Sequence, residues 1–169
     1  MFEDFFGSEN IDIGKGLGIA MDLENRSRTY YLGKASYTGT TEGRRLFEFL
    51  AREELRHLKA LEGLKEQLAG SALKWGEAGT KVKPDIFRPF DAKKIEEIPI
   101  PESILDAAIN VERESIEFYT KFSAKIGTDD GRKFFAKLAD FEKSHFDLLN
   151  QLLELSGVKV EGAGAPGEV

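Results

Sequence analysis

The feature that most constrains the fold of this chain is an internal repeat with an offset of 88 residues. One phrase, T-x-x-G-R-x-x-F-x-x-L-A-x-x-E-x-x-H-x-x-x-L-x-x-L, begins at Thr40 and again at Thr128, and it contains both histidines of the chain. The same offset aligns three pairs outside the phrase: Ala20 with Ala108, Glu24 with Glu112, and Tyr31 with Tyr119. Because similar sequences adopt similar local structure, we expect two copies of one unit related by an approximate twofold axis.

Apolar residues recur at intervals of three and four in four long segments, which predicts helices at about residues 11–37, 41–68, 101–126 and 132–155. Short glycine-containing turns join the first helix to the second and the third to the fourth, whereas residues 69–100 form a long connection between the second and the third. This order predicts an all-α fold, the ferritin-like antiparallel four-helix bundle with one long crossover between helices 2 and 3. We expect a single domain over residues 1–155 and a disordered, Gly-rich tail at 156–169. Trp75 and the segment 87–90 are expected to pack over the bundle as part of the connection.

Each copy of the phrase places a glutamate three residues before a histidine, at Glu54 and His57 and again at Glu142 and His145. Three helical residues turn through about 300°, so the two side chains of each pair project from one face. Leucines at spacings of three, four and seven flank both pairs, which indicates that this face points towards the core.

Two further glutamates, Glu24 and Glu112, lie in similar apolar stripes, each 30 residues before the glutamate of a Glu-x-x-His pair. Four buried carboxylates need a counter-charge, because an unpaired buried charge is costly. Nearby inward positions hold no Lys or Arg, whereas two divalent ions would supply four positive charges. Oxygen and nitrogen ligands without sulfur suit iron or manganese better than a structural zinc site.

These six residues carry a resemblance to a known family. Over about residues 11–155 the chain resembles the rubrerythrin-like branch of the ferritin superfamily of di-iron carboxylate proteins. The resemblance implies two bound iron ions, with manganese or a mixed pair as the alternative. It also implies a role for each ligand: Glu54 and Glu142 bridge the ions, Glu24 and Glu112 bind them terminally, and His57 and His145 each complete one coordination sphere. Tyr31 and Tyr119, two turns beyond the terminal glutamates, are expected to hydrogen-bond a ligand or a bound oxygen species.

The chain departs from the family pattern in two respects. Peroxidase-type rubrerythrins typically carry a carboxylate three residues after the third-helix glutamate, and here that position is Ser115. The chain has no cysteine, which excludes a rubredoxin-type iron site within it, so we expect it to lack the rubredoxin domain and to use a separate electron donor such as a rubredoxin-type protein. Three other glutamates near the motifs, Glu53, Glu114 and Glu117, are expected to be exposed.

The favoured function is a non-haem di-iron oxidoreductase that reduces hydrogen peroxide or dioxygen, in oxidative-stress defence. One alternative is a ferroxidase for iron storage or detoxification, and a second is a structural bundle with relict ligands. Because each half supplies half of the ligands, we expect a homodimer in which whole hairpins can be exchanged between subunits.

Composition excludes several other classes of partner. A formal net charge of -6 with interleaved acidic and basic residues argues against nucleic-acid binding. The N-terminus lacks the charge and apolar pattern of a signal peptide, and no apolar run approaches the roughly 18 residues of a membrane span. We therefore expect a cytoplasmic protein with no membrane partner.

Overall fold

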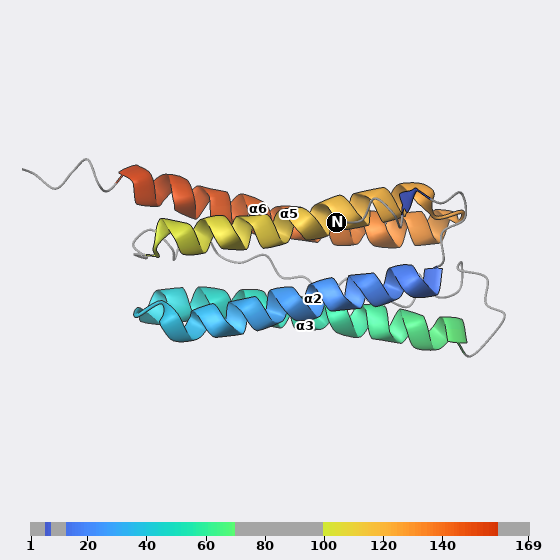
Figure 1. The fold of residues 1–169 in the computed structure, drawn as a ribbon, viewed down its shortest axis with the longest axis horizontal. Helices are drawn as coiled ribbons and strands as arrows, with labels where there is room; N and C mark the ends of the chain where they lie inside the picture. The colour runs from blue at the N-terminus through green and yellow to red at the C-terminus, as the bar shows by residue number, and fades with distance from the viewer. Residues whose placement is uncertain (1–5, 8–12, 70–99, 159–169) are drawn as a thin grey trace, which may run out of the picture.

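The structure is a computed structural model that describes residues 6–7, 13–69 and 100–158, the last three of these without their side chains. The described residues contain the helices α2 (Ile13–Tyr37), α3 (Thr41–Ala69), α5 (Glu102–Lys125) and α6 (Asp129–Val158), and no strand. The helices pack side by side as an antiparallel four-helix bundle (Figure 1). The predicted all-α, ferritin-like fold is confirmed.

The bundle consists of two helical hairpins, α2 with α3 and α5 with α6 (Figure 1). α3 and α5 run in the same direction, so α3 ends at the opposite end of the bundle from the start of α5. The two helix ends that the long connection joins therefore lie at opposite ends of the bundle, as predicted for the crossover. Most of that connection, including Trp75 and residues 87–90, lies outside the described residues.

Threonine caps explain why the repeated phrase begins where it does. The Thr40 hydroxyl accepts a hydrogen bond from the Gly43 amide at 3.1 Å, and the Thr128 hydroxyl accepts one from the Gly131 amide at 3.3 Å. Each threonine thus satisfies an amide that has no partner within its helix. Gly39, in the turn before the first cap, has a φ of 67°, a conformation that glycine adopts without steric cost.

The fourth helix is longer than predicted at both ends. The prediction began it near Arg132 because the segment GTDDG looks like a turn, but α6 begins at Asp129. Thr128 caps this helix, and Asp129 and Asp130 lie in its first turn, where carboxylates interact favourably with the helix dipole. α6 also continues to Val158, so the predicted tail starts too early, and residues 159–169 lie outside the described part.

The core contains two apolar clusters that are repeats of one another. Leu17, Ala20, Tyr119 and Phe135 belong to one cluster. Their repeat equivalents belong to the other: Leu105, Ala108, Tyr31 and Phe47. The geometry also repeats, because the ring centroids of Tyr31 and Phe47 lie 6.0 Å apart at 27° and those of Tyr119 and Phe135 lie 6.0 Å apart at 28°. The sequence repeat therefore appears in space as an approximate twofold axis between the hairpins.

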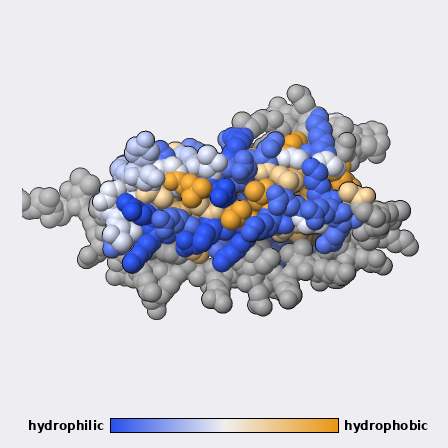
Figure 2. All heavy atoms as spheres, turned by 90° about the horizontal axis from the view of Figure 1, so that it is seen from below, coloured by the Kyte–Doolittle hydropathy of each residue, from blue (hydrophilic) through white to orange (hydrophobic). Residues whose placement is uncertain are grey.

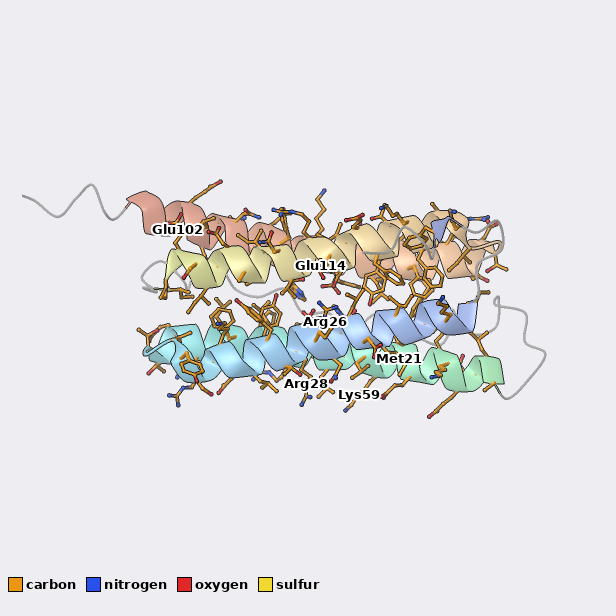
Figure 3. All side chains as sticks on the ribbon, viewed as in Figure 1. Met21, Arg26, Arg28, Lys59, Glu102 and Glu114 are labelled. Atoms are coloured by element: carbon orange, nitrogen blue, oxygen red, sulfur yellow. The ribbon has the colours of Figure 1, made fainter. Side chains whose placement is uncertain are left out.

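The face of the bundle seen in Figure 2 is mostly hydrophilic where its residues are described. Seen from below, charged and polar side chains cover much of the coloured surface, with apolar atoms in a band between them (Figure 2). Arg26 of α2 and Glu114 of α5 face one another across the two hairpins (Figure 3), with Nη2 and Oε2 3.5 Å apart. These two residues occupy equivalent positions of the repeat. Within the described part of the chain, no helix is both long and apolar enough to cross a membrane.

Candidate metal centre

The six predicted ligands meet in the middle of the bundle, and all four helices contribute. α2 supplies Glu24 and α5 supplies Glu112, whereas α3 and α6 each supply a Glu-x-x-His pair. None of the six residues is more than 6% exposed. The helical spacing that predicted an inward face is therefore sufficient to bring four carboxylates and two imidazoles into one buried cluster.

The two histidines lie at the centre of this cluster. Their rings stack with centroids 5.8 Å apart at 17°. Glu54 approaches both of them, with one oxygen 3.5 Å from His57 Nδ1 and the other 3.5 Å from His145 Nδ1. Glu142 does the same, with its two oxygens 2.9 Å from His57 Nδ1 and 3.7 Å from His145 Nδ1. These two carboxylates therefore lie between the histidines.

The remaining two glutamates each approach a single histidine. Glu24 Oε2 lies 3.4 Å from His57 Nδ1, and Glu112 Oε2 lies 3.8 Å from His145 Nδ1. The donors consequently form two groups, each with ligand atoms within 4.8 Å of one another: Glu24, Glu54, His57 and Glu142 in one, and Glu54, Glu112, Glu142 and His145 in the other. Only Glu54 and Glu142 belong to both groups.

Each buried tyrosine contacts the glutamate of the opposite hairpin. The Tyr31 hydroxyl donates a hydrogen bond to Glu112 Oε1, and the Tyr119 hydroxyl donates one to Glu24 Oε1. Each bond fixes one carboxylate oxygen and leaves the other directed towards a histidine. Burial, followed by the negative charge of the bonded glutamate, raises the pKa of both tyrosines, so the hydroxyls remain protonated donors.

Several polar atoms of the cluster have no hydrogen-bond partner among the described residues. They are Glu24 Oε2, both carboxylate oxygens of Glu54, Glu112 Oε2, Glu142 Oε1 and His145 Nδ1. Buried polar atoms are rarely left unsatisfied, and every ion pair that these carboxylates form within the described part of the chain involves a histidine, not Lys or Arg. Oxygen and imidazole donors directed at one another fit cations of the iron and manganese type.

Without a bound cation, the cluster must be neutralised by protons. Burial, and next the repulsion of a second carboxylate, raises the pKa of Glu24 and of Glu112 well above the ordinary value. Burial opposes charge on the histidines, but the surrounding carboxylates raise the pKa of both. Burial also opposes charge on Glu54 and Glu142, yet contacts with the two histidines lower both pKa values. At a pH between the lowered and the raised pKa values, two carboxyls are ionised, two carboxyls are protonated and both imidazoles are charged, so the metal-free cluster is neutral.

A comparison with protein-family models finds a match to the Rubrerythrin family over residues 15–154. The chain belongs to the rubrerythrin family. This match covers the whole of α3 and α5, most of α2 and α6, and all six residues of the cluster. Comparisons with curated proteins and with solved structures found no match.

Two further positions, Ser115 and Glu53, lie close to the ligands in the sequence, and both are buried. Ser115 is buried on the inner face of α5, so no carboxylate occupies that position, and its repeat equivalent Ser27 is buried as well. The prediction that Glu53 is exposed is wrong, because its side chain is only 3% exposed and forms an ion pair with Arg56. The repeat contained the missed signal, since the offset aligns Glu53 with the apolar residue Phe141. By contrast, Glu114 and Glu117 are substantially exposed, as predicted.

Proposed function

We propose that the central cluster binds two iron ions and that the protein is a non-haem di-iron oxidoreductase that reduces hydrogen peroxide or dioxygen, in oxidative-stress defence. The observation that carries this proposal is the arrangement of the donors in two groups that share two glutamates. A pair of ions bridged by carboxylates requires that arrangement. A single-ion site would not.

The proposed ligand roles follow from the contacts. Glu54 and Glu142 would each hold both ions, because each approaches both histidines. Glu24 with His57 and Glu112 with His145 complete the two positions. Iron supplies the two electrons that peroxide reduction requires, and manganese or a mixed pair is the alternative metal content.

The protein residues contribute orientation and exclusion of water. Tyr31 and Tyr119 hold the terminal glutamates by one oxygen each, which restricts how far these carboxylates can rotate. The apolar clusters on both sides of the centre keep bulk water away from the donors. Because the chain has no cysteine, the reducing electrons come from a separate donor, such as a rubredoxin-type protein.

A ferroxidase is the second candidate, and one observation favours it. Serine occupies the position where peroxidase-type rubrerythrins carry an extra carboxylate, and the equivalent position in the other half is also serine. The protein therefore offers a six-ligand centre without the additional carboxylate of the peroxidase. An iron-oxidising centre does not require that carboxylate.

Anaerobic stopped-flow mixing of the Fe(II)-loaded protein with peroxide and with dioxygen tests the proposal. Much faster oxidation by peroxide supports the reductase, whereas preference for dioxygen with many iron ions oxidised per chain supports the ferroxidase. Glu142→Ala, which removes one shared ligand, is the control and should abolish stoichiometric binding of two ions. Size-exclusion chromatography adds a second criterion, because we propose a homodimer and a shell-sized particle would favour storage. If the anaerobically purified protein binds no metal, the cluster is relict and both proposals fail.

A further inference from the structure

The two halves of the bundle differ at the positions that flank the histidines. The offset of 88 residues aligns Glu53 with Phe141, and Phe49 with Lys137. The six donors and the two tyrosines obey the repeat, so this asymmetry lies immediately outside an otherwise symmetric cluster. It gives the two proposed metal positions different surroundings.

The His57 position has an apolar neighbour. The Phe141 ring lies against His57, with centroids 6.0 Å apart at 33°. A phenyl ring can neither bind a cation directly nor hydrogen-bond a water molecule that does. On this side the histidine packs against an uncharged ring.

The His145 position has a carboxylate neighbour. Glu53 holds the position on α3 that Phe141 holds on α6, and its side chain is 3% exposed. Arg56, itself 40% exposed, forms an ion pair with Glu53 Oε1 from the solvent side. The edge of the Phe49 ring approaches His145, with centroids 6.5 Å apart at 80°.

Two observations connect Glu53 with the metal centre. His145 is the most exposed of the six donors, and its Nδ1 atom lacks a hydrogen-bond partner among the described residues. The approximate twofold axis places Glu53 beside His145, because its repeat equivalent Phe141 lies against His57. Glu53 is therefore on the His145 side of the cluster.

We infer that Glu53 is a fifth carboxylate of the metal centre, which serves the position formed by Glu112 and His145 and makes this position bind a divalent cation more tightly than the position formed by Glu24 and His57. The inference rests on the proposed metal centre. Its physical basis is the added negative charge beside one position, held in place by Arg56, whereas the equivalent place beside the other position is taken by the aromatic ring of Phe141. Partners just outside a metal's ligands typically change metal affinity by about 10-fold to 100-fold.

Titration of the metal-free full chain with Co²⁺, followed by visible absorption, tests the inference without any turnover. The wild-type protein should bind two ions in two resolved steps. Glu53→Gln keeps the size of the side chain and an acceptor for Arg56 but removes the charge, and it should weaken the first step about 10-fold. Glu53→Phe, which copies Phe141, should bring the two steps together. Circular dichroism and the melting temperature verify that each variant is folded.

Single-histidine backgrounds show which position Glu53 serves. In His57→Asn, where the His145 position remains complete, Glu53→Gln should again weaken Co²⁺ binding about 10-fold. In His145→Asn, where the His57 position remains complete, the same change should alter binding by less than about twofold.

The possible failures can be told apart. Two bound ions with affinities unchanged by either substitution at Glu53 would overturn this inference and leave the metal centre intact. Equal effects of Glu53→Gln in both single-histidine backgrounds would also overturn it, because Glu53 would then act on the whole centre. A wild-type protein that binds no Co²⁺ would instead remove the proposed metal centre, and the inference with it.

Discussion

Metal loading of the central cluster should release about four protons per chain, a number that follows from its charges. The metal-free cluster carries four groups with raised pKa values: Glu24, Glu112, His57 and His145. Metal ligation requires ionised carboxylates and neutral imidazoles, so two incoming divalent ions displace the proton of each of these groups. With ordinary pKa values the same six side chains would release only about half a proton in total at pH 7, almost all of it from the histidines.

The proton release fixes the pH dependence of the affinity. Release of two protons per ion strengthens binding by about 2.7 kcal/mol per ion for each unit of increase in pH, as long as the four groups are protonated in the metal-free form. The dependence disappears at a pH above their raised pKa values. Affinity for Mn²⁺ should therefore rise steeply through the neutral range.

Isothermal titration with Mn²⁺ in buffers of different ionisation enthalpy measures the proton count directly. Glu24→Gln is the matched control, because it removes one titrating carboxyl and should release one proton fewer. Release of fewer than about one proton on binding of two ions would refute the charge assignment. The cluster would then be ionised before the metal arrives.

Three further predictions concern the stability of the protein and the hydrogen bond of Tyr31. In the metal-free protein, the four raised pKa values contribute stability that is present below the ordinary pKa of each group and is lost as pH rises through the raised value. The melting temperature should therefore fall from weakly acidic to alkaline pH. A melting temperature that stays constant or rises would contradict this prediction. Gly16→Ala should be less stable than Gly18→Ala by about 1–3 kcal/mol in chemical unfolding. A Cβ at Gly16 would lie 2.3 Å from the Phe122 ring, whereas nothing lies within 4 Å of a Cβ at Gly18. Equal stabilities of the two variants would show that the helices separate at no cost. Tyr31→Phe removes the hydrogen bond to Glu112 and should weaken Mn²⁺ binding by about 10-fold or more with little change in fold. Unchanged affinity would show that Tyr31 contributes to packing and not to metal binding.

The sequence predicted the helices and the cluster because both depend on local spacing. The three-residue interval between Glu54 and His57 fixes a common face whatever the helix packs against. Helix ends were less predictable: a helix beginning near Arg132 was expected from the glycines of GTDDG, but the Thr128 cap and the acidic first turn extend α6 to Asp129. Whether such a segment forms a loop or the capped first turn of a helix depends on individual hydrogen bonds, whose strengths cannot be ranked from composition alone.

The sequence by itself determined that the chain forms two equivalent helical hairpins with acidic side chains on their inner faces, since periodicity and the repeat are properties of the chain. Only the tertiary structure decided which glutamate each tyrosine hydrogen-bonds, because the bonds from Tyr31 to Glu112 and from Tyr119 to Glu24 join one hairpin to the other. It also showed that Glu53 is buried, which the sequence indicated only through the alignment of Glu53 with Phe141. A helix has one inward face when it is considered alone, but in a bundle it has two neighbours, and the contact with the second neighbour buries residues that a single apolar stripe leaves outside.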